Sequence, residues 1–154
     1  MKVITAKEMA RVEKLAFAEG ASGDLFMQEA ARKIASYVDS YIEENHLAKR
    51  LILFCGKGNN GGDAYCAASF LSDKGYEITA YQIFPLEECS PLCQKYAHQF
   101  QEKGHQICYQ DKIPSFEKGV ILDGILGTGF EGKLSEELEK VVTLTNGTEL
   151  PVIS

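Results

Sequence analysis

Residues 51–63 read LILFCGKGNNGGD. The four apolar residues and the cysteine predict a buried strand, and the polar segment after them predicts a loop that leads into a helix. Four glycines in the seven positions from 56 to 62 make this loop costly to order. A chain keeps such a loop where its backbone must approach a partner closely, most often a phosphate or a nucleotide. The ligand is therefore to be identified from this loop and from whatever faces it.

The length and composition describe an ordinary globular protein. The 154 residues are enough for one domain with a substantial core, and 45% of them are hydrophobic. The net charge of -6, without a block of Lys and Arg, argues against nucleic-acid binding. Residues 1–8 lack the apolar run of a signal peptide, and no segment approaches the roughly 18 apolar residues of a membrane span. We therefore expect no nucleic-acid partner and no membrane partner.

The chain contains five cysteines: Cys55, Cys66, Cys89, Cys93 and Cys108. Their number is odd and their spacing matches no zinc-binding pattern. We expect reduced thiols that pack as small apolar side chains, which is typical of a cytoplasmic protein.

Strands and helices alternate along the sequence. Apolar runs predict strands at 51–55, 78–84, 106–109, 120–122 and 151–154. Capping residues predict that helices begin near Asp63, Ser90 and Ser135, and glycines end the first two at Gly75 and Gly104. This alternation predicts a three-layer α/β fold with a doubly wound, mostly parallel, Rossmann-like sheet. No linker or repeat divides the chain, so we expect one domain over residues 1–154.

Two helices are predicted before the first strand. Thr5 and Glu8 have the spacing of a capping box, and Met9, Val12 and Leu15 follow on one helical face. Apolar residues at helical spacing predict the second helix at 24–43. We expect both helices to pack on the sheet as an extra layer or to form a dimer surface.

The glycine-rich loop at 56–61 satisfies the pattern G-x-G-x-x-G between a strand and a helix. A Rossmann cofactor site is one interpretation, but a carboxylate at Asp63 would compete with a pyrophosphate for the positive end of the helix. A phosphate-binding P-loop is excluded because no Gly-Lys-Ser/Thr follows. Asn59 and Asn60 add side-chain oxygens and amides, which favours a loop that holds a polar ligand together with a cation.

A second loop, DGILGTGFEGK at 123–133, follows another buried strand. Ligands of open α/β sheets bind at the carboxyl ends of the strands, so both glycine loops should open on the same crevice. Asp123, at the end of its strand, can ligate a cation or move a proton. The alternative is that Asp123 only caps a turn or the next helix.

These motifs together resemble the YjeF N-terminal domain family, which includes the NAD(P)H-hydrate epimerases. The resemblance rests on GKGNNGGD at 56–63, on Asp123 and on GTG at 127–129. The segment MQEAA at 27–31 is similar to an early Met-x-x-Ala-Gly helix of the family, with Ala31 where Gly is common. The similarity covers nearly the whole chain.

The resemblance implies an isomerase that interconverts the R and S epimers of hydrated NADH and NADPH, known as NADHX and NADPHX. An ADP- or ATP-dependent NAD(P)H-hydrate dehydratase, fused or separate, would then regenerate the cofactor. The implied substrate-binding residues are Asn59, Asn60, Gly61, Gly62, Asp63, Gly127, Thr128, Gly129, Phe130, Glu131, Gly132 and Lys133. Asn60 and Asp123 would hold a potassium ion through oxygen atoms.

Asp123 is the candidate catalytic acid or base. Epimerisation requires loss and return of a hydroxyl, or ring opening and closure, and either route needs a group that exchanges a proton. A carboxylate that also ligates a cation is a poorer base, because the cation stabilises its ionised form. The sequence leaves both roles open.

The sequence also departs from the family pattern. Ala64 stands where the family often has Gly. After a strand like 151–154 the family has an Asp-x-Pro-Ser-Gly segment, whose Asp binds the substrate and whose Ser completes the potassium site. The sequence ends before this segment. We therefore expect a domain that is incomplete at its C-terminal end.

Two other interpretations compete with the epimerase. YjeF-like domains also serve as non-catalytic dimerisation or scaffold modules, but a pure scaffold has no need of the Asn60 and Asp123 pair. A nicotinamide dehydrogenase should carry an acidic residue at the end of its second strand, and Glu87 and Glu88 lie too late for that. The amphipathic N-terminal helices make a homodimer the expected assembly. The sequence shows no clear Arg for the 2′-phosphate of NADPHX, so it predicts no preference between NADHX and NADPHX.

Overall fold

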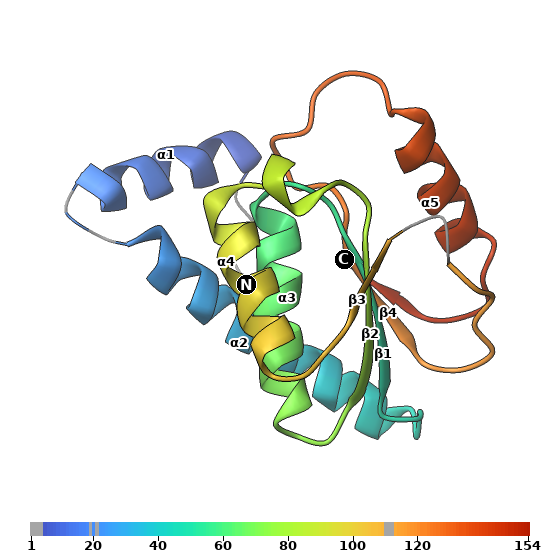
Figure 1. Ribbon diagram of the computed structural model, residues 1–154. Coiled ribbons are helices and arrows are strands. Elements are labelled where there is room, and N and C mark those ends of the chain that lie inside the picture. Colours follow the sequence, from blue (N-terminus) through green and yellow to red (C-terminus); the bar gives the residue numbers. More distant parts are fainter. Residues whose placement is uncertain (1–4, 19, 21, 110–112) are drawn as a thin grey trace.

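The computed structural model describes residues 5–18, 20, 22–109 and 113–154. Within them, five strands form one sheet in the order β3-β2-β1-β4-β5 (Figure 1). These strands are β1 (Arg50–Cys55), β2 (Glu77–Gln82), β3 (Ile107–Tyr109), β4 (Val120–Gly124) and β5 (Val152–Ile153). Every strand pair is parallel, which confirms the doubly wound sheet and makes it wholly parallel over the described residues. The order reverses between β1 and β4, and ligands of such sheets bind at the carboxyl ends next to this reversal.

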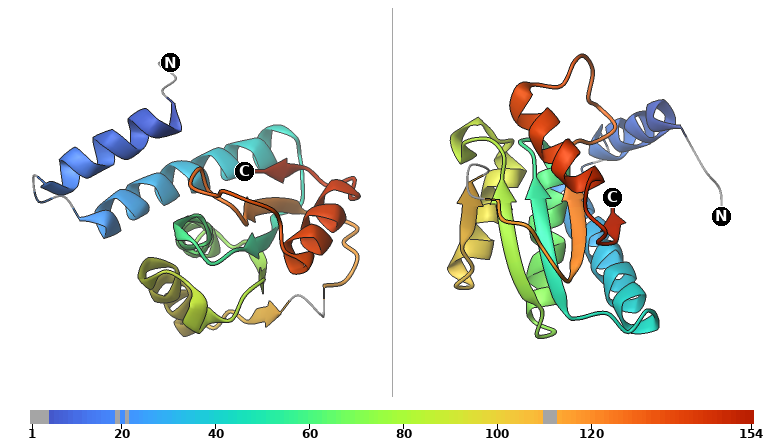
Figure 2. Two further views of the ribbon diagram at one scale, coloured as in Figure 1. Left: turned by 90° about the horizontal axis from the view of Figure 1, so that it is seen from above. Right: turned by 90° about the vertical axis from the view of Figure 1, so that its right-hand side faces the viewer.

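Helices cover both faces of the sheet, as the three-layer prediction requires. Helices α2 (Gly23–Glu44), α3 (Asn59–Ser72) and α4 (Pro91–Glu102) lie on one face, and α5 (Glu136–Asn146) lies on the other (Figures 1 and 2). Leu51 and Leu53 of β1 belong to the core under α2, α3 and α4, while Ile52 and Phe54 belong to the core under α5. Because both faces are buried, β1 is a continuous apolar run. No helix in the described residues has the length and apolarity needed to cross a bilayer.

The two N-terminal helices behave differently. Helix α2 packs through buried residues at helical spacing, which include Met27 and Val38, and this part of the prediction is correct. Helix α1 (Ala6–Ala18) instead lies outside the layers, beside the beginning of α2 (Figure 1). Its residues Met9, Val12 and Leu15 are 47%, 54% and 56% exposed, so α1 does not pack on the sheet as an extra layer, and a dimer surface stays the prediction for this helix.

Most helix ends follow their capping residues. The Thr5 backbone N–H donates to Glu8 Oε2 at 2.9 Å, as the capping box predicts. The Ser90 Oγ accepts from the N–H of Cys93 at the start of α4, and the Ser135 Oγ does the same for Leu138 in α5. These helix starts therefore lie where the sequence predicts them.

Helix α3 is the exception, because it begins at Asn59 and not near Asp63. Asp63 therefore lies in the second turn of the helix, and Gly58 takes the N-cap position. A Cβ on Gly61 would lie 2.5 Å from the Gly56 carbonyl oxygen, and one on Gly62 would lie 2.9 Å from the Met27 Sδ. Tertiary packing therefore selects glycine in this turn, although Gly and Asn have low helix propensity. The helix ends at Ser72, and Gly75 follows in a turn with a φ of 80°.

Candidate active site

The start of α3 is held by the segment that precedes α4. Gly58 is the N-cap in an extended conformation and makes no side-chain cap bond. The Ser90 Oγ donates to Asn59 Oδ1 at 2.8 Å, and the Ser90 N–H donates to the Lys57 carbonyl at 2.8 Å. The first N–H groups of a helix lack partners within the helix and carry partial positive charge. This end of α3 is therefore a fixed and polar element.

Three glycines of the first loop serve contacts within the protein. A Cβ on Gly56 would lie 1.9 Å from the backbone oxygen of Ile125, and Gly61 and Gly62 are as closely packed. The sequence analysis attributed these glycines to approach by a ligand, and for these three the structure gives packing as the reason. Gly58 and Gly129 have no heavy atom within 4 Å of an added Cβ, so a ligand can approach these two.

The second loop is tied to the first. The Asn60 Nδ2 donates to the Leu126 carbonyl at 3.0 Å, and the Gly56 N–H donates to the Gly124 carbonyl at 3.0 Å. Asp123 pairs in register with Phe54 of β1, and its Oδ1 accepts the Ile125 N–H at 2.9 Å. Asp123 therefore caps a turn, as the alternative interpretation proposed. This bond leaves its second oxygen without a hydrogen bond from the described residues.

A cavity of about 290 Å³ opens where α2, α3, β4 and β5 meet. It brings Asn60 and Asp63 of α3 together with Asp123 of β4, which is far from them in the sequence. Its lining residues are Lys33, Ile34, Tyr37, Asn60, Asp63, Ala64, Leu122, Asp123, Ile153 and Ser154. The cavity lies at the carboxyl ends of β4 and β5, beside the reversal of strand order. This is the crevice that the two glycine loops predict.

The donor atoms in the cavity suit a hard cation. Because the Asn60 amino group donates to Leu126, its Oδ1 is the amide atom left for a ligand. The second oxygen of Asp123 is available in the same cavity. Potassium is satisfied by amide and carboxylate oxygens of this kind. Among the described residues no three His, Cys, Asp or Glu side chains gather as a transition-metal site would require.

With this geometry, the chain can be compared with known proteins. A model of the family described as YjeF-related protein N-terminus matches residues 23–154, from the first residue of α2 to the residue after β5. The chain belongs to this family. Helix α1 lies outside the matched part.

Relatives of this YjeF-family chain include named enzymes. It is 28% identical to a protein named NAD(P)H-hydrate epimerase from Phaeosphaeria nodorum, over 100% of this chain and 64% of that protein. A protein of the same name from Elusimicrobium minutum is 26% identical, over 96% of this chain and 71% of that protein. A bifunctional NAD(P)H-hydrate repair enzyme Nnr from Moorella thermoacetica is 24% identical, and the match covers 95% of this chain and 29% of the enzyme. The chain thus spans about two thirds of the two epimerases.

The crystal structure of a yeast protein, ynu0 (YNL200c), has the same fold. The TM-score is 0.83 at 23% sequence identity, over 99% of this chain and 68% of the yeast chain. At this identity the similarity supports the Rossmann-like architecture alone.

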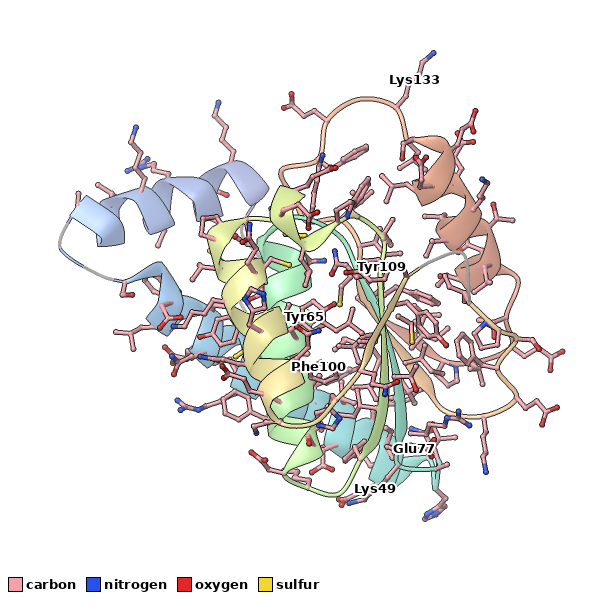
Figure 3. All side chains as sticks on the ribbon, in the orientation of Figure 1. Lys49, Tyr65, Glu77, Phe100, Tyr109 and Lys133 are labelled. Carbon is pink, nitrogen blue, oxygen red and sulfur yellow. The ribbon has the colours of Figure 1, made fainter. Side chains whose placement is uncertain are left out.

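The remaining predicted binding residues of this family member are not among the residues that line the cavity. Asn59 bonds to Ser90, while Gly61 and Gly62 are buried. None of these three lines the cavity. The segment 127–133 is exposed and contains Gly127, Thr128, Gly129, Phe130, Glu131, Gly132 and Lys133. Lys133 points away from the body of the protein (Figure 3). The segment begins beside the cavity, because a Cβ on Gly127 would lie 3.5 Å from the Cβ of Asn60.

The sequence analysis missed the contribution of α2. Lys33, Ile34 and Tyr37 line the cavity. Ile34 belongs to the apolar stripe that the helical spacing predicts, but Lys33 and Tyr37 lie outside it. Exposed residues on a helix give no signal of this kind, because Lys and Tyr are ordinary on a solvated face. Only the placement of α2 above the ends of β4 and β5 would have identified them.

The end of β2 argues against an ordinary dinucleotide site in this YjeF-family chain. Such a site requires an acidic residue for the ribose, and the residue here is the fully buried Gln82. Its Oε1 accepts from the Tyr65 hydroxyl at 2.9 Å, and its Nε2 donates to the Gly56 carbonyl at 3.3 Å. Tyr65 is itself buried, 5.5 Å from the ring of Phe100 (Figure 3). Tyr65 therefore packs in the core, and Gln82 at the end of β2 holds the first loop through its bond to the Gly56 carbonyl.

The cysteines beneath this loop are unreactive. Burial raises the pKa of Cys93 to about 12, and it raises the pKa values of Cys55 and Cys89 as well. These side chains therefore stay protonated near neutral pH, and thiols without charge are poor nucleophiles. All five cysteines are free thiols, as the sequence analysis expected.

Proposed function

We propose that this protein interconverts the R and S epimers of hydrated NADH and NADPH. The observation that carries the proposal is the cavity in which Asn60, Asp63 and Asp123 come together. Two relatives named NAD(P)H-hydrate epimerase support the substrate class. A scaffold module would have no use for this group of oxygen atoms.

The reaction needs a proton donor and acceptor beside the hydrated ring. In the elimination route the hydroxyl takes up a proton and leaves as water, while the ring nitrogen lone pair forms an iminium bond to the same carbon. Water then adds to the opposite face and returns a proton. Asp123 is the proposed group, because the Ile125 N–H fixes one carboxylate oxygen and leaves the other for the substrate.

Asn60 and Asp123 are the proposed ligands of a potassium ion. When bound, the ion would supply a fixed positive charge that orients and stabilises an oxygen of the substrate. A carboxylate that ligates a cation is a weaker base. Asp63 is the second carboxylate of the cavity. Variants of Asp63 and of Asp123 are therefore compared to identify the carboxylate that transfers the proton.

The cellular setting is part of the same proposal. We propose a cytoplasmic protein, which five free thiols support. We propose a homodimer, because Met9, Val12, Leu15 and Leu25 leave apolar side chains exposed along α1 and the start of α2. An ADP- or ATP-dependent dehydratase is the proposed partner, fused or separate, since bifunctional repair enzymes are among the relatives.

The proposal is tested with the purified S epimer of hydrated NADH in potassium buffer. Formation of the R epimer is followed by chromatography, against the spontaneous rate without protein. We expect acceleration by the wild-type chain, none by Asp123→Asn, and a partial loss in Asp63→Asn. A wild-type rate equal to the spontaneous rate would overturn the proposal for this chain. Equal activity of wild type and Asp123→Asn would remove Asp123 from the mechanism.

A further inference from the structure

The cavity is divided into an apolar and a polar side. Ile34, Leu122 and Ile153 provide apolar surface, whereas Asn60 and Asp123 provide oxygen atoms. Its volume of about 290 Å³ lies at the small end of the range for ligand pockets. Such a space accepts one ring with its sugar and not a whole dinucleotide.

Helix α2 forms one wall of this cavity, and it is rigidly placed. A Cβ on Gly62 would lie 2.9 Å from Met27 Sδ, so α2 and α3 are in close contact at this point. Ala31 and Ala35 continue the buried side of α2 with small side chains. Residues on the flank of α2 are therefore fixed relative to the residues of α3, as a binding site requires.

Tyr37 is an aromatic residue on this flank. Its side chain lines the cavity, yet the residue is 60% exposed. Its ring stacks on Tyr41, with a centroid distance of 6.4 Å and an angle of 27° between the ring planes. Tyr41 thus lies beside the ring of Tyr37 and leaves most of it exposed to a flat ligand. A ring with an apolar face and polar substituents would stack there.

Lys33 lies one turn before Tyr37 and is the only cationic side chain among the cavity-lining residues. Lys74, Lys95 and Lys103 form ion pairs with aspartates, but Lys33 forms none with any residue that the structure describes. With Asp63 and Asp123 in the same cavity, an anionic group of a ligand needs such a cation. A phosphate next to the ribose would meet it at the cavity rim.

We propose that Tyr37 and Lys33 bind the nicotinamide half of the substrate, with the hydrated ring against Tyr37 and the adjacent phosphate at Lys33. This inference rests on the proposed function and adds α2 to the residues that determine specificity. The adenosine half lies outside the cavity. It makes no contact with this pair.

The first test is kinetic and uses the variants Tyr37→Ala and Lys33→Gln. We expect KM for hydrated NADH to rise about fivefold in Tyr37→Ala and about threefold to tenfold in Lys33→Gln, with kcat within about twofold of wild type. Lys33→Arg should keep the wild-type KM. One matched control is Tyr109→Ala, which replaces an exposed Tyr of β3 (Figure 3), at the edge of the sheet opposite to β5. The other is Lys118→Gln, which replaces a Lys just before β4, at the amino ends of the strands and so away from the cavity. Unchanged KM values in both α2 variants would overturn the inference.

The second test does not depend on turnover. Calorimetry measures binding of nicotinamide mononucleotide and, separately, of AMP to wild type and to the same variants. We expect both α2 substitutions to weaken binding of the nicotinamide nucleotide by the factors given above for KM. The affinity for AMP should not change. If wild type shows no epimerisation but this pattern of binding holds, the proposed function is refuted, and the role of Tyr37 and Lys33 in binding the nicotinamide nucleotide is supported. Equal losses for the two nucleotides, or no binding of nicotinamide mononucleotide by wild type, would refute the role of α2.

Discussion

Replacing Gly56 by Ala should destabilise the protein by forcing its two glycine loops apart. The added Cβ would lie 1.9 Å from the Ile125 backbone oxygen and 2.9 Å from the Ile125 carbonyl carbon. Both are backbone atoms, so no side chain can rotate away. The second loop must retreat by about 1.5–2 Å before an ordinary contact is restored. The retreat strains the bond from the Gly56 N–H to the Gly124 carbonyl, which is 3.0 Å long.

The magnitude follows from two terms. Overpacking of a close contact costs about 1–3 kcal/mol. A buried hydrogen bond that is lost on one side costs about 1–3 kcal/mol. Together they reduce the free energy of unfolding by about 2–6 kcal/mol, out of the roughly 5–15 kcal/mol of a typical domain. The corresponding fall in Tm is about 4–24 °C.

Urea unfolding followed by circular dichroism measures this loss, since the chain has no Trp for fluorescence. The matched control is Gly58→Ala, two residues later in the same loop. No atom lies within 4 Å of its added Cβ, and its φ of -86° is open to any residue. Gly58→Ala should change the free energy of unfolding by no more than about 0.5 kcal/mol. Equal urea midpoints for the two variants would refute the reasoning that packing, and not a ligand, requires glycine at position 56.

Three further predictions concern acid stability, the buried network and the cation. Hydrogen bonds from Lys74 and from the Tyr76 hydroxyl lower the pKa of Asp39. The stability that these bonds add is complete above the unfolded pKa of about 3.9 and is lost as the pH falls through the lowered value. Asp39→Asn should therefore flatten the fall in urea midpoint below about pH 4. Gln82→Leu should cost about 2–4 kcal/mol of unfolding free energy, and adding Tyr65→Phe should recover about 1 kcal/mol, because no buried hydroxyl is then left without a partner. Asn60→Ala should make the epimerisation rate equal in potassium and sodium chloride at the same ionic strength, whereas a retained preference for potassium would show that Asn60 is not a ligand.

Local signals in the sequence predict much of this fold. Ser90 and Ser135 begin helices because their hydroxyls accept a free N–H of the first turn, and this chemistry depends only on neighbouring residues. The apolar run of β1 predicts a strand buried on both sides, and therefore helices on both faces of the sheet. Asp123 at the end of β4 lies at the crevice because carboxyl ends of parallel strands meet at one edge.

The start of α3 could not be predicted in this way. Asn59 and Gly61 have low helix propensity, so a reader of the sequence places them in a loop and begins the helix at Asp63. The first turn forms because Gly61 lets the helix touch the Gly56 carbonyl and Gly62 lets it touch Met27. Those contacts join residues from α2, from the loop after β1 and from α3, and no local pattern contains them.

The contribution of α2 to the cavity also depends on contacts between distant segments, so it could not be predicted from local patterns. Its buried stripe is visible in the sequence, because apolar residues recur at helical spacing. Tyr37 and Lys33 lie beside that stripe, where exposed residues are usually without a role. They gain one because the strand order places β4 and β5 beyond β1, so the ends of these strands lie beside the flank of α2. A chain that kept both glycine loops but carried Ala at positions 33 and 37 would look the same by motif, and it should bind the nicotinamide nucleotide more weakly.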